Sequence, residues 1–221
     1  KSGKSSASPK GRKFACLIAR DSTYLERLYN EAQDYHNFRD VSLKNLYKAI
    51  NTITSRGYFV VRMGVKVKSR LETNNSMIID YADSPMRSDF LDIYLGAKCS
   101  FCISNGTGFD AIPTIFRKPI LFINRVPASL IFTFTSNSIG LIKHHFSKKI
   151  KKILTLEELS SYKSFDSSFS NVFADEEIEL IENSEDEIND AAIEMIDFIE
   201  EKNQDIIHHQ LQKKDKKRYL E

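Results

Sequence analysis

The residues with the clearest chemical potential form a glycine turn, Asn105-Gly106-Thr107-Gly108. An apolar run precedes the turn, and a short helical segment and a second apolar run follow it, which predicts a strand, a turn, a helix and a strand. Backbone N–H groups at such a turn, together with the helix dipole, favour an anion such as phosphate. The turn is therefore a candidate phosphate site, although a tight turn that needs positive φ also explains these glycines.

A cation and an acid, Arg20-Asp21, follow another apolar run at residues 14–19. Six such runs alternate with helical segments, which is typical of a parallel sheet covered on both faces. The predicted strands are residues 14–19, 58–63, 77–80, 100–104, 119–123 and 138–142. We therefore expect an α/β, doubly wound, mainly parallel sheet of about six strands with helices on both faces.

If the strand order is the usual 3-2-1-4-5-6, the first and fourth strands are neighbours where the winding reverses, and ligands bind at their carboxyl ends. Arg20 and the glycine turn would then meet in one crevice. An Arg guanidinium suits a diphosphate, and an ion pair between Arg20 and Asp21 or Asp110 is the competing interpretation. The hydroxyl of Thr107 could likewise contact phosphate or only cap the helix.

The helices needed to complete this fold have clear signals. A helix covers residues 43–53 and ends at Gly57, and a second one, capped by Ser84 or Ser88, is expected to bury Phe90, Leu91, Tyr94 and Leu95. Two capping boxes, Thr155 with Glu158 and Ser184 with Glu187, predict further helix starts. Residues 160–170 are predicted to be a loop.

Further candidate residues follow the other predicted strands, and each has a structural alternative. Arg62 with Gly64 could reach phosphate or base, and a surface ion pair explains Arg62 equally well. Asp80-Tyr81 could contact base or ribose, with a turn cap as the alternative for Asp80. Ser88 and Asp89 could orient a phosphate or only cap a helix. His36, in the loop at residues 34–40, could act as a base, contact the acceptor or only face solvent.

Composition limits the class of protein. With 221 residues, 41% of them hydrophobic, the chain suits one well-cored domain, and no apolar run approaches the ~18 residues of a membrane span, so we expect a soluble protein. We divide it into a polar linker or tail at residues 1–13, the domain at 14–202, and a charged helix or tail at 203–221. The first residue is Lys1, so the chain could be a fragment. Its three cysteines suit a reducing compartment, and Cys99 and Cys102 are expected to be small buried residues.

The net charge of +2 hides basic and acidic segments, including five lysines within residues 143–152. Solvated faces explain these lysines best, and contact with an anionic membrane surface is the alternative; no nucleic-acid motif accompanies them. The histidine pairs at 144–145 and 208–209 lack further ligands at metal spacing, so no metal site is predicted.

Several segments together resemble a bacterial family of glycosyltransferases from surface-polysaccharide gene clusters. They are ISNGTGFDAIPTIFRKPILFIN, RSDFLDIYLGAKC, GYFVVRMG and IENSEDEINDAAIEM. The resemblance covers about residues 14–200. More distantly, the same region is similar to the donor-binding half of GT-B fucosyltransferases.

The resemblance implies a Rossmann-like domain, one half of a GT-B fold, that binds the diphosphate of a nucleotide-sugar donor and transfers hexose or deoxyhexose to a saccharide acceptor. It also implies a separate N-terminal acceptor domain, no metal or other cofactor, and a cytoplasmic enzyme that could touch the inner membrane face. The donor-diphosphate residues would be Arg20, Asn105, Gly106, Thr107 and Gly108. Because the general base often belongs to the other domain, no catalytic base is assigned.

Two other functions fit parts of the sequence. Gly106-x-Gly108-x-x-Ala111 matches the dinucleotide fingerprint of an NAD(P)-binding oxidoreductase, but it follows the fourth strand instead of the first, and the next strand ends in Asn124 where an acidic residue is expected. The chain could also be a non-catalytic interaction module whose acidic helix, near residues 186–201, meets a partner.

Overall fold

The structure, a computed structural model, describes residues 11–20, 40–65, 67, 70–130 and 137–218, with side chains described as far as residue 201. Six strands pair in parallel in the order β3-β2-β1-β4-β5-β6. Their bounds are β1 (Phe14–Ile18), β2 (Phe59–Met63), β3 (Ile78–Asp80), β4 (Phe101–Ser104), β5 (Ile120–Arg125) and β6 (Ser138–Ile142). The α/β, doubly wound, Rossmann-like architecture and the strand order 3-2-1-4-5-6 are confirmed.

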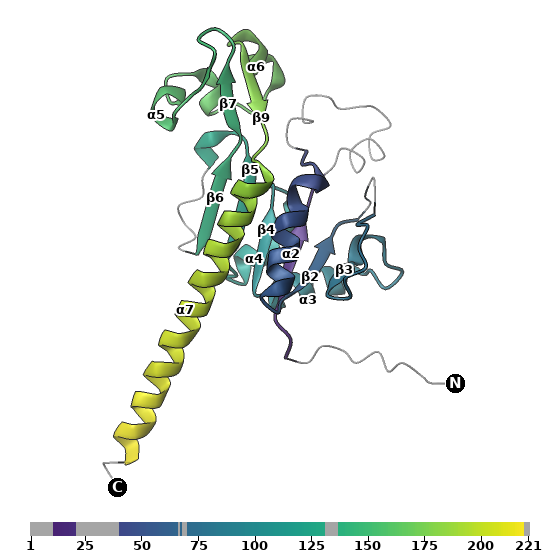
Figure 1. Cartoon of the computed structure of the whole chain (residues 1–221), viewed down its shortest axis with the longest axis vertical. Helices are drawn as coiled ribbons and strands as arrows, with labels where there is room; N and C mark the ends of the chain where they lie inside the picture. The colour runs from purple at the N-terminus through teal and green to yellow at the C-terminus, as the bar shows by residue number, and fades with distance from the viewer. Residues whose placement is uncertain (1–10, 21–39, 66, 68–69, 131–136, 219–221) are drawn as a thin grey trace.

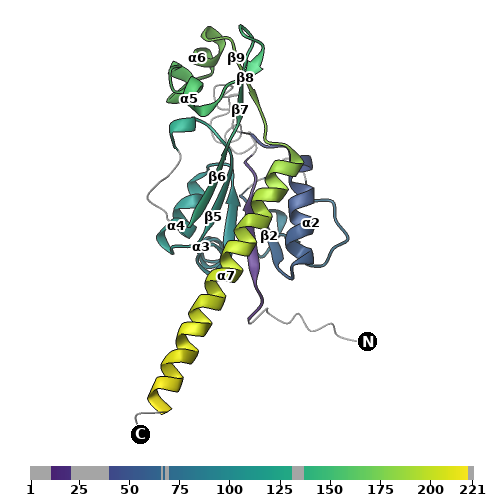
Figure 2. The same ribbon diagram turned by 60° about the vertical axis from the view of Figure 1, so that its left-hand side comes forward.

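Helices cover both faces of this sheet. Helix α2 (Tyr47–Ser55), entered through the 3-10 turn η2 (Leu43–Leu46), and the long helix α7 (Glu185–Arg218) lie on one face. Helix α3 (Asp89–Lys98) and the short α4 (Ala111–Ile115), preceded by the turn η4 (Gly108–Asp110), lie on the other (Figure 2). The last part of α7 extends past the sheet, away from the rest of the molecule (Figure 1).

The buried strands alternate their side chains between the two helical layers, as the pleat requires. In β1, Ala15 and Leu17 belong to the core cluster under α2 and α7, and Cys16 belongs to the cluster under α3. Leu91 and Leu95 of α3 pack on that second cluster. Both faces of β1 are therefore buried, which explains why its sequence is a continuous apolar run.

The cysteine prediction is confirmed, because Cys16, Cys99 and Cys102 are all buried free thiols. Burial raises the pKa of the Cys102 thiol well above its usual value. Within the described part of the chain, no helix has both the length and the apolar character needed to cross a bilayer.

One prediction about α3 is wrong. The helix was expected to bury Phe90, Leu91, Tyr94 and Leu95, but Phe90 is 72% exposed and Tyr94 is 48% exposed. Ser88 does cap α3, since its hydroxyl accepts the N–H of Leu91 at 3.3 Å. The helix is apolar on its outer side as well as its inner one, so periodicity could not tell which side faces the sheet.

A second, smaller sheet was not predicted. It contains β7 (His144–Ser147), β8 (Lys152–Ile153) and β9 (Ile178–Ile181) in the antiparallel order β8-β7-β9. It lies beyond the carboxyl ends of the main strands, together with α5 (Leu156–Leu159) and α6 (Ser170–Asp175) (Figure 1). The remaining turns are η3 (Tyr81–Asp83), η5 (Ala128–Leu130) and η6 (Lys163–Phe165), the last within the predicted loop at 160–170.

Both predicted capping boxes are present. At the start of α5 the Thr155 hydroxyl accepts the N–H of Glu158 at 3.2 Å, and the Glu158 carboxylate accepts the N–H of Thr155 at 3.0 Å. Ser184 and Glu187 exchange the same two bonds at the start of α7, at 3.2 and 2.8 Å. Each box satisfies N–H groups that helix geometry leaves without partners.

Candidate functional site

The structure brings Arg20 and the glycine turn together. The N–H of Arg20, two residues after β1, donates to Oδ1 of Asn105, the first residue after β4, at 2.9 Å. These two strands are adjacent, with Ile18 opposite Ser104. The predicted juxtaposition at the point where the winding reverses is therefore present, and a side-chain hydrogen bond fixes it.

The glycine turn is less open than the sequence suggested. The N–H of Gly106 donates to Oγ of Ser104 at 3.1 Å, and the N–H of Thr107 donates to a carboxylate oxygen of Asp110 at 3.0 Å. The Thr107 hydroxyl also lies 3.4 Å from Asp110, so it forms part of the cap. Gly108 is the open corner of the turn, because it is exposed and a Cβ built on it would meet no atom within 4 Å.

Asp110 brings a carboxylate close to the turn. It is buried, and burial raises the pKa of the Asp110 carboxyl, against hydrogen bonds from Ser104 and Thr107 and the charge of Arg125. An ionised Asp110 would repel an anion at the turn, and a nearby cation offsets that effect.

That cation is Arg125, a residue that sequence reasoning missed. A Cβ built on Gly106, whose φ is +90°, would lie 2.4 Å from Nη1 of Arg125, so the guanidinium packs against the backbone of the turn. Arg125 ends β5, lies 4.8 Å from the ring centroid of Phe122, and donates to the carbonyl of Leu130 at 3.1 Å. The sequence does contain a signal for Arg125, because this residue ends the strand that follows the glycine turn.

Asp40 lies across the same edge of the sheet and connects two cations. Its Oδ1 is 3.6 Å from a guanidinium nitrogen of Arg20, and its backbone carbonyl accepts Nζ of Lys143 at 3.3 Å. This ion pair with Asp40 was not among the predicted ones; of the two predicted partners of Arg20, Asp21 lies outside the described residues. Both side chains are partly accessible, with exposed fractions of 14% for Arg20 and 29% for Asp40.

Lys143 differs from the other lysines of its cluster. It is only 4% exposed, and burial lowers the pKa of its ammonium group, against the charges of Glu182 and Asp40. It follows β6 at the carboxyl edge, so it is a buried cation and not part of a solvated face. Lysines 148, 149, 151 and 152 do form an exposed group in and beside the turn between β7 and β8.

The candidate residues at the ends of β2 and β3 have structural partners. Arg62 is 1% exposed and lies 3.4 Å from Asp80, which makes this a buried pair and not a surface one. Asp80 also accepts the N–H of Leu71 at 2.8 Å. A Cβ on Gly64 would lie 3.2 Å from the side chains of Ala82 and Val67, so close packing explains this glycine.

Tyr81 and Ser88 bind each other. The Tyr81 hydroxyl accepts the N–H of Ser88 at 3.1 Å and donates to its carbonyl at 3.3 Å, and the ring packs in the core under α3. Burial raises the pKa of the Tyr81 phenol. Asp89 is the exposed first residue of α3. Asp21 and His36 lie outside the described residues.

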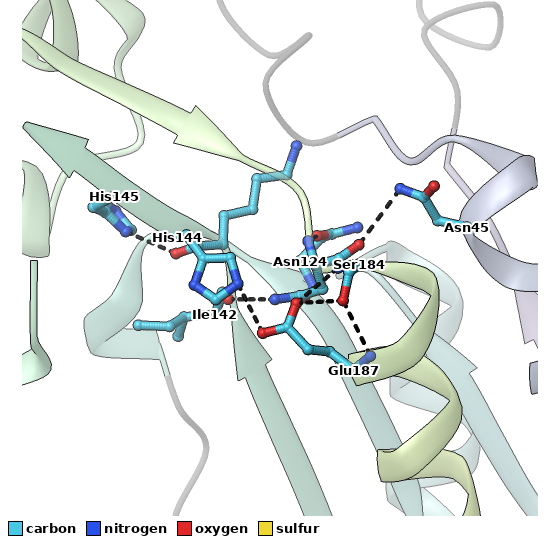
Figure 3. A network of polar contacts seen from close by, with 9 residues as sticks. Asn45, Asn124, Ile142, His144, His145, Ser184 and Glu187 are labelled. Carbon is cyan, nitrogen blue, oxygen red and sulfur yellow. Dashed lines mark hydrogen bonds and ion pairs between the residues drawn. The ribbon is translucent and has the colours of Figure 1, made fainter. Parts of the chain in front are cut away.

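Two buried asparagines, Asn124 of β5 and Asn183 just before α7, bind each other close to the site; Figure 3 labels Asn124. The N–H of Asn124 donates to Oδ1 of Asn183, and the N–H of Asn183 donates to Oδ1 of Asn124, both at 2.7 Å. Asn183 also donates to the carbonyl of Ile142 at 2.8 Å. This reciprocal pair holds Asn124 at a φ of +51°, a conformation that asparagine tolerates better than most residues.

His144 and His145, for which no metal site was predicted, have different surroundings. His144 lies 2.8 Å from Glu187 of α7, whereas His145 is buried, with Nδ1 2.8 Å from the carbonyl of Lys143 (Figure 3). Burial lowers the pKa of His145, so its neutral form is favoured. No group of three potential metal ligands occurs among the residues that the structure describes.

Comparisons of the chain with protein-family models, with curated proteins and with solved structures gave no match. The fold and the site by themselves define an α/β, Rossmann-like domain with cationic side chains and a glycine turn at the carboxyl edge of its sheet.

Proposed function

We propose that this chain is the donor-binding domain of a glycosyltransferase that transfers a sugar from a nucleotide-sugar to a saccharide acceptor in surface glycan biosynthesis. The observation that carries the proposal is the hydrogen bond between the N–H of Arg20 and Asn105. It joins a cation after β1 to the glycine turn after β4, at the position where doubly wound sheets bind their ligands.

The chemistry of sugar transfer suits this arrangement. Negative charge grows on the departing nucleoside diphosphate, so fixed positive groups at that position stabilise the transition state more than the ground state. In the proposal, the Arg20 guanidinium and the N–H of Gly108 contact the diphosphate. Arg125 contributes positive potential from beneath the turn, opposite Asp110. The protein's own cations neutralise the leaving group, so the proposal needs no metal.

The remaining parts of the proposal concern partners and location. A separate N-terminal domain would hold the saccharide acceptor and complete a GT-B enzyme, and the enzyme would work in the cytoplasm. The exposed lysines at 148, 149, 151 and 152 could meet anionic lipid at the inner membrane face. Two acids of α7, Asp186 and Asp197, pair with Lys48 and Arg56 of the same chain, so these two charges are already used within the domain and add no support to the interaction module.

A nucleotide panel tests the proposal. Thermal-shift measurements with UDP, GDP, CDP, a sugar conjugate of each, NAD and NADP should show stabilisation by one nucleoside diphosphate and its sugar conjugate, since a ligand that binds only the folded state raises Tm. Stabilisation by NAD or NADP alone would favour the oxidoreductase, and no stabilisation by any nucleotide would favour the interaction module.

Two variants identify the site within the same assay. Arg20→Ala should weaken binding of the best diphosphate about tenfold or more, because a charge-assisted hydrogen bond contributes roughly 1.5–3 kcal/mol. Gly108→Val should also weaken it, since the new side chain would stand in the open corner of the turn. Arg56→Ala is the matched control, because Arg56 pairs with Asp197 on the α2–α7 surface.

A further inference from the structure

Lys143 is a buried cation without an ion pair in the described part of the chain. It is 4% exposed, although a lysine side chain is almost never fully buried unless it is paired. Its Nζ donates to the backbone carbonyl of Asp40 at 3.3 Å, and no carboxylate of the described residues forms an ion pair with it. An ammonium group has three donors, so one long hydrogen bond to a neutral acceptor leaves most of its bonding capacity unused.

The two acids whose charges act on Lys143 are bonded to other groups. Oε2 of Glu182 accepts the N–H of Ser42 and the side-chain amide of Asn45, both at 3.1 Å. The carboxylate of Asp40 faces a different cation of the site. Burial therefore lowers the pKa of the Lys143 ammonium group more than the charges of Glu182 and Asp40 raise it. A buried charge of this kind costs free energy until an opposite charge meets it.

Lys143 lies at the same edge of the sheet as the candidate site. It follows β6, and its N–H donates to the carbonyl of Arg125 at 3.2 Å. The N–H of Val41 donates to the carbonyl of Arg20 at 3.4 Å, which places Asp40 beside the end of β1. Because β4 and β5 separate β6 from β1 in the sheet, the hydrogen bond from Lys143 to Asp40 joins groups from across the carboxyl edge, where the glycine turn also lies.

The other two cations of the site each have an acid close by. Asp40 lies 3.6 Å from the guanidinium of Arg20, and the charges of Asp110 and Arg125 act on each other. These acids reduce the positive charge that the two arginines offer to an anion. Lys143 adds a cation that no ion pair compensates within the described residues, and a charge in a buried site interacts more strongly than one in water.

We propose that Lys143 binds the terminal phosphate of the nucleoside diphosphate. The inference rests on the proposed function. A phosphate group supplies both the negative charge and the acceptor oxygens that the buried ammonium lacks. The terminal phosphate of a free nucleoside diphosphate also has more negative charge than the same phosphate in the sugar conjugate. Lys143 should therefore favour the departing diphosphate over the intact donor.

Isothermal titration calorimetry with a nucleoside monophosphate and a nucleoside diphosphate of the same base tests the proposal. The wild type should prefer the diphosphate. Lys143→Met keeps a long unbranched side chain but removes the charge, so it should weaken diphosphate binding about tenfold and leave monophosphate binding unchanged. Lys149→Met is the matched control, because Lys149 is exposed in the turn between β7 and β8, and this variant should keep the wild-type preference.

A purely structural role for Lys143 predicts a different result. If the ammonium only holds Asp40 in place, Lys143→Met should lower the Tm of the ligand-free chain and leave the preference for the diphosphate unchanged. We expect no loss of Tm, because replacing a poorly compensated buried charge by an apolar side chain is often neutral or stabilising. Lys143→Gln is a second variant, which lacks the charge but keeps a donor, and it should lose the preference as well.

The preference for the diphosphate decides between these roles. An unchanged preference in the Lys143 variants, with diphosphate still bound, would overturn the role of Lys143 and leave the proposed function intact. A wild-type chain that binds neither nucleotide for any base would overturn both.

Discussion

The two glycines of the turn are there for different reasons. Gly106 has a φ of +90° and packs on Arg125, so both the backbone and the space exclude a side chain. Gly108 has neither constraint, since a Cβ there would meet nothing within 4 Å. Gly106 is thus needed to shape the turn, and Gly108 keeps its outer corner accessible.

This difference predicts contrasting effects of the same substitution. Gly106→Ala should lower the free energy of unfolding by about 1–3 kcal/mol, the cost of holding a side chain in an unfavourable backbone conformation. Gly108→Ala should leave it nearly unchanged. Urea unfolding of both variants measures the difference, and equal destabilisation by the two would contradict the assigned roles.

A substitution of Asp40 should strengthen nucleotide binding, whereas Arg20→Ala should weaken it. The Asp40 carboxylate lies 3.6 Å from the Arg20 guanidinium, where it would compete with a bound diphosphate for the same positive charge. Asp40→Asn keeps the backbone carbonyl that accepts Lys143. We therefore expect this variant to bind a nucleoside diphosphate several-fold more tightly than the wild type, measured by isothermal titration calorimetry at low salt. Weaker binding would indicate that Asp40 itself holds part of the ligand.

At the scale of elements, α7 is fixed to the two sheets by polar contacts at its first turn. Glu187 accepts hydrogen bonds from the N–H and hydroxyl of Ser184 at 2.8 and 2.9 Å and pairs with His144 of β7 at 2.8 Å. Burial opposes the charge, but these contacts together lower the pKa of the Glu187 carboxyl.

A carboxylate with a lowered pKa stabilises the folded state above its ordinary pKa, and that contribution is lost as the pH falls through the folded value. Glu187→Gln should therefore destabilise the protein at pH 7, and the difference from wild type should shrink below the ordinary glutamate pKa of about 4.3. Thermal unfolding from pH 7 to pH 3.5 measures it. Glu194→Gln, an exposed change in the same helix, should show no such trend.

The main sheet could be predicted because its central strands have a clear local signal. Buried parallel strands are continuous apolar runs, so β1, β4 and β5 stand out against the capped helices between them. The small sheet could not be found in this way. Its strands have two to four residues, and β7 and β8 flank a lysine-rich turn that is typical of a solvated face. Its structure depends on a separate apolar cluster that includes Leu159 and Phe173, which are distant in sequence from β7.

The sequence predicted where the candidate site lies in the fold, but it did not predict all the residues that form it. Strand order alone placed Arg20 beside the glycine turn, because parallel strands end at a common edge. The sequence could not show that Asp110 uses the N–H of Thr107, that Arg125 lies beneath Gly106, or that Lys143 is buried. These features depend on side-chain packing between residues from different strands.

For the whole molecule, the proposed function requires a ligand at the carboxyl edge of the main sheet. The glycine turn follows β4 at that edge, whereas α3 covers a broad side of the same sheet. Changes on the outer side of α3 should therefore leave nucleotide affinity unchanged. Phe90→Asp should bind the diphosphate as the wild type does, which equilibrium binding at matched concentrations would check.

The most direct test of the central claim is an amide NMR titration of the ¹⁵N-labelled chain with a nucleoside diphosphate. Glycine amides are well suited to it, because Gly106 and Gly108 belong to the candidate site, while Gly57 and Gly96 lie elsewhere in the fold. We predict that the resonances of Arg20, Gly106 and Gly108 shift in a saturable way and that those of Gly57 and Gly96 stay in place. Saturable shifts confined to other parts of the sheet, or none at millimolar nucleotide, would contradict the account.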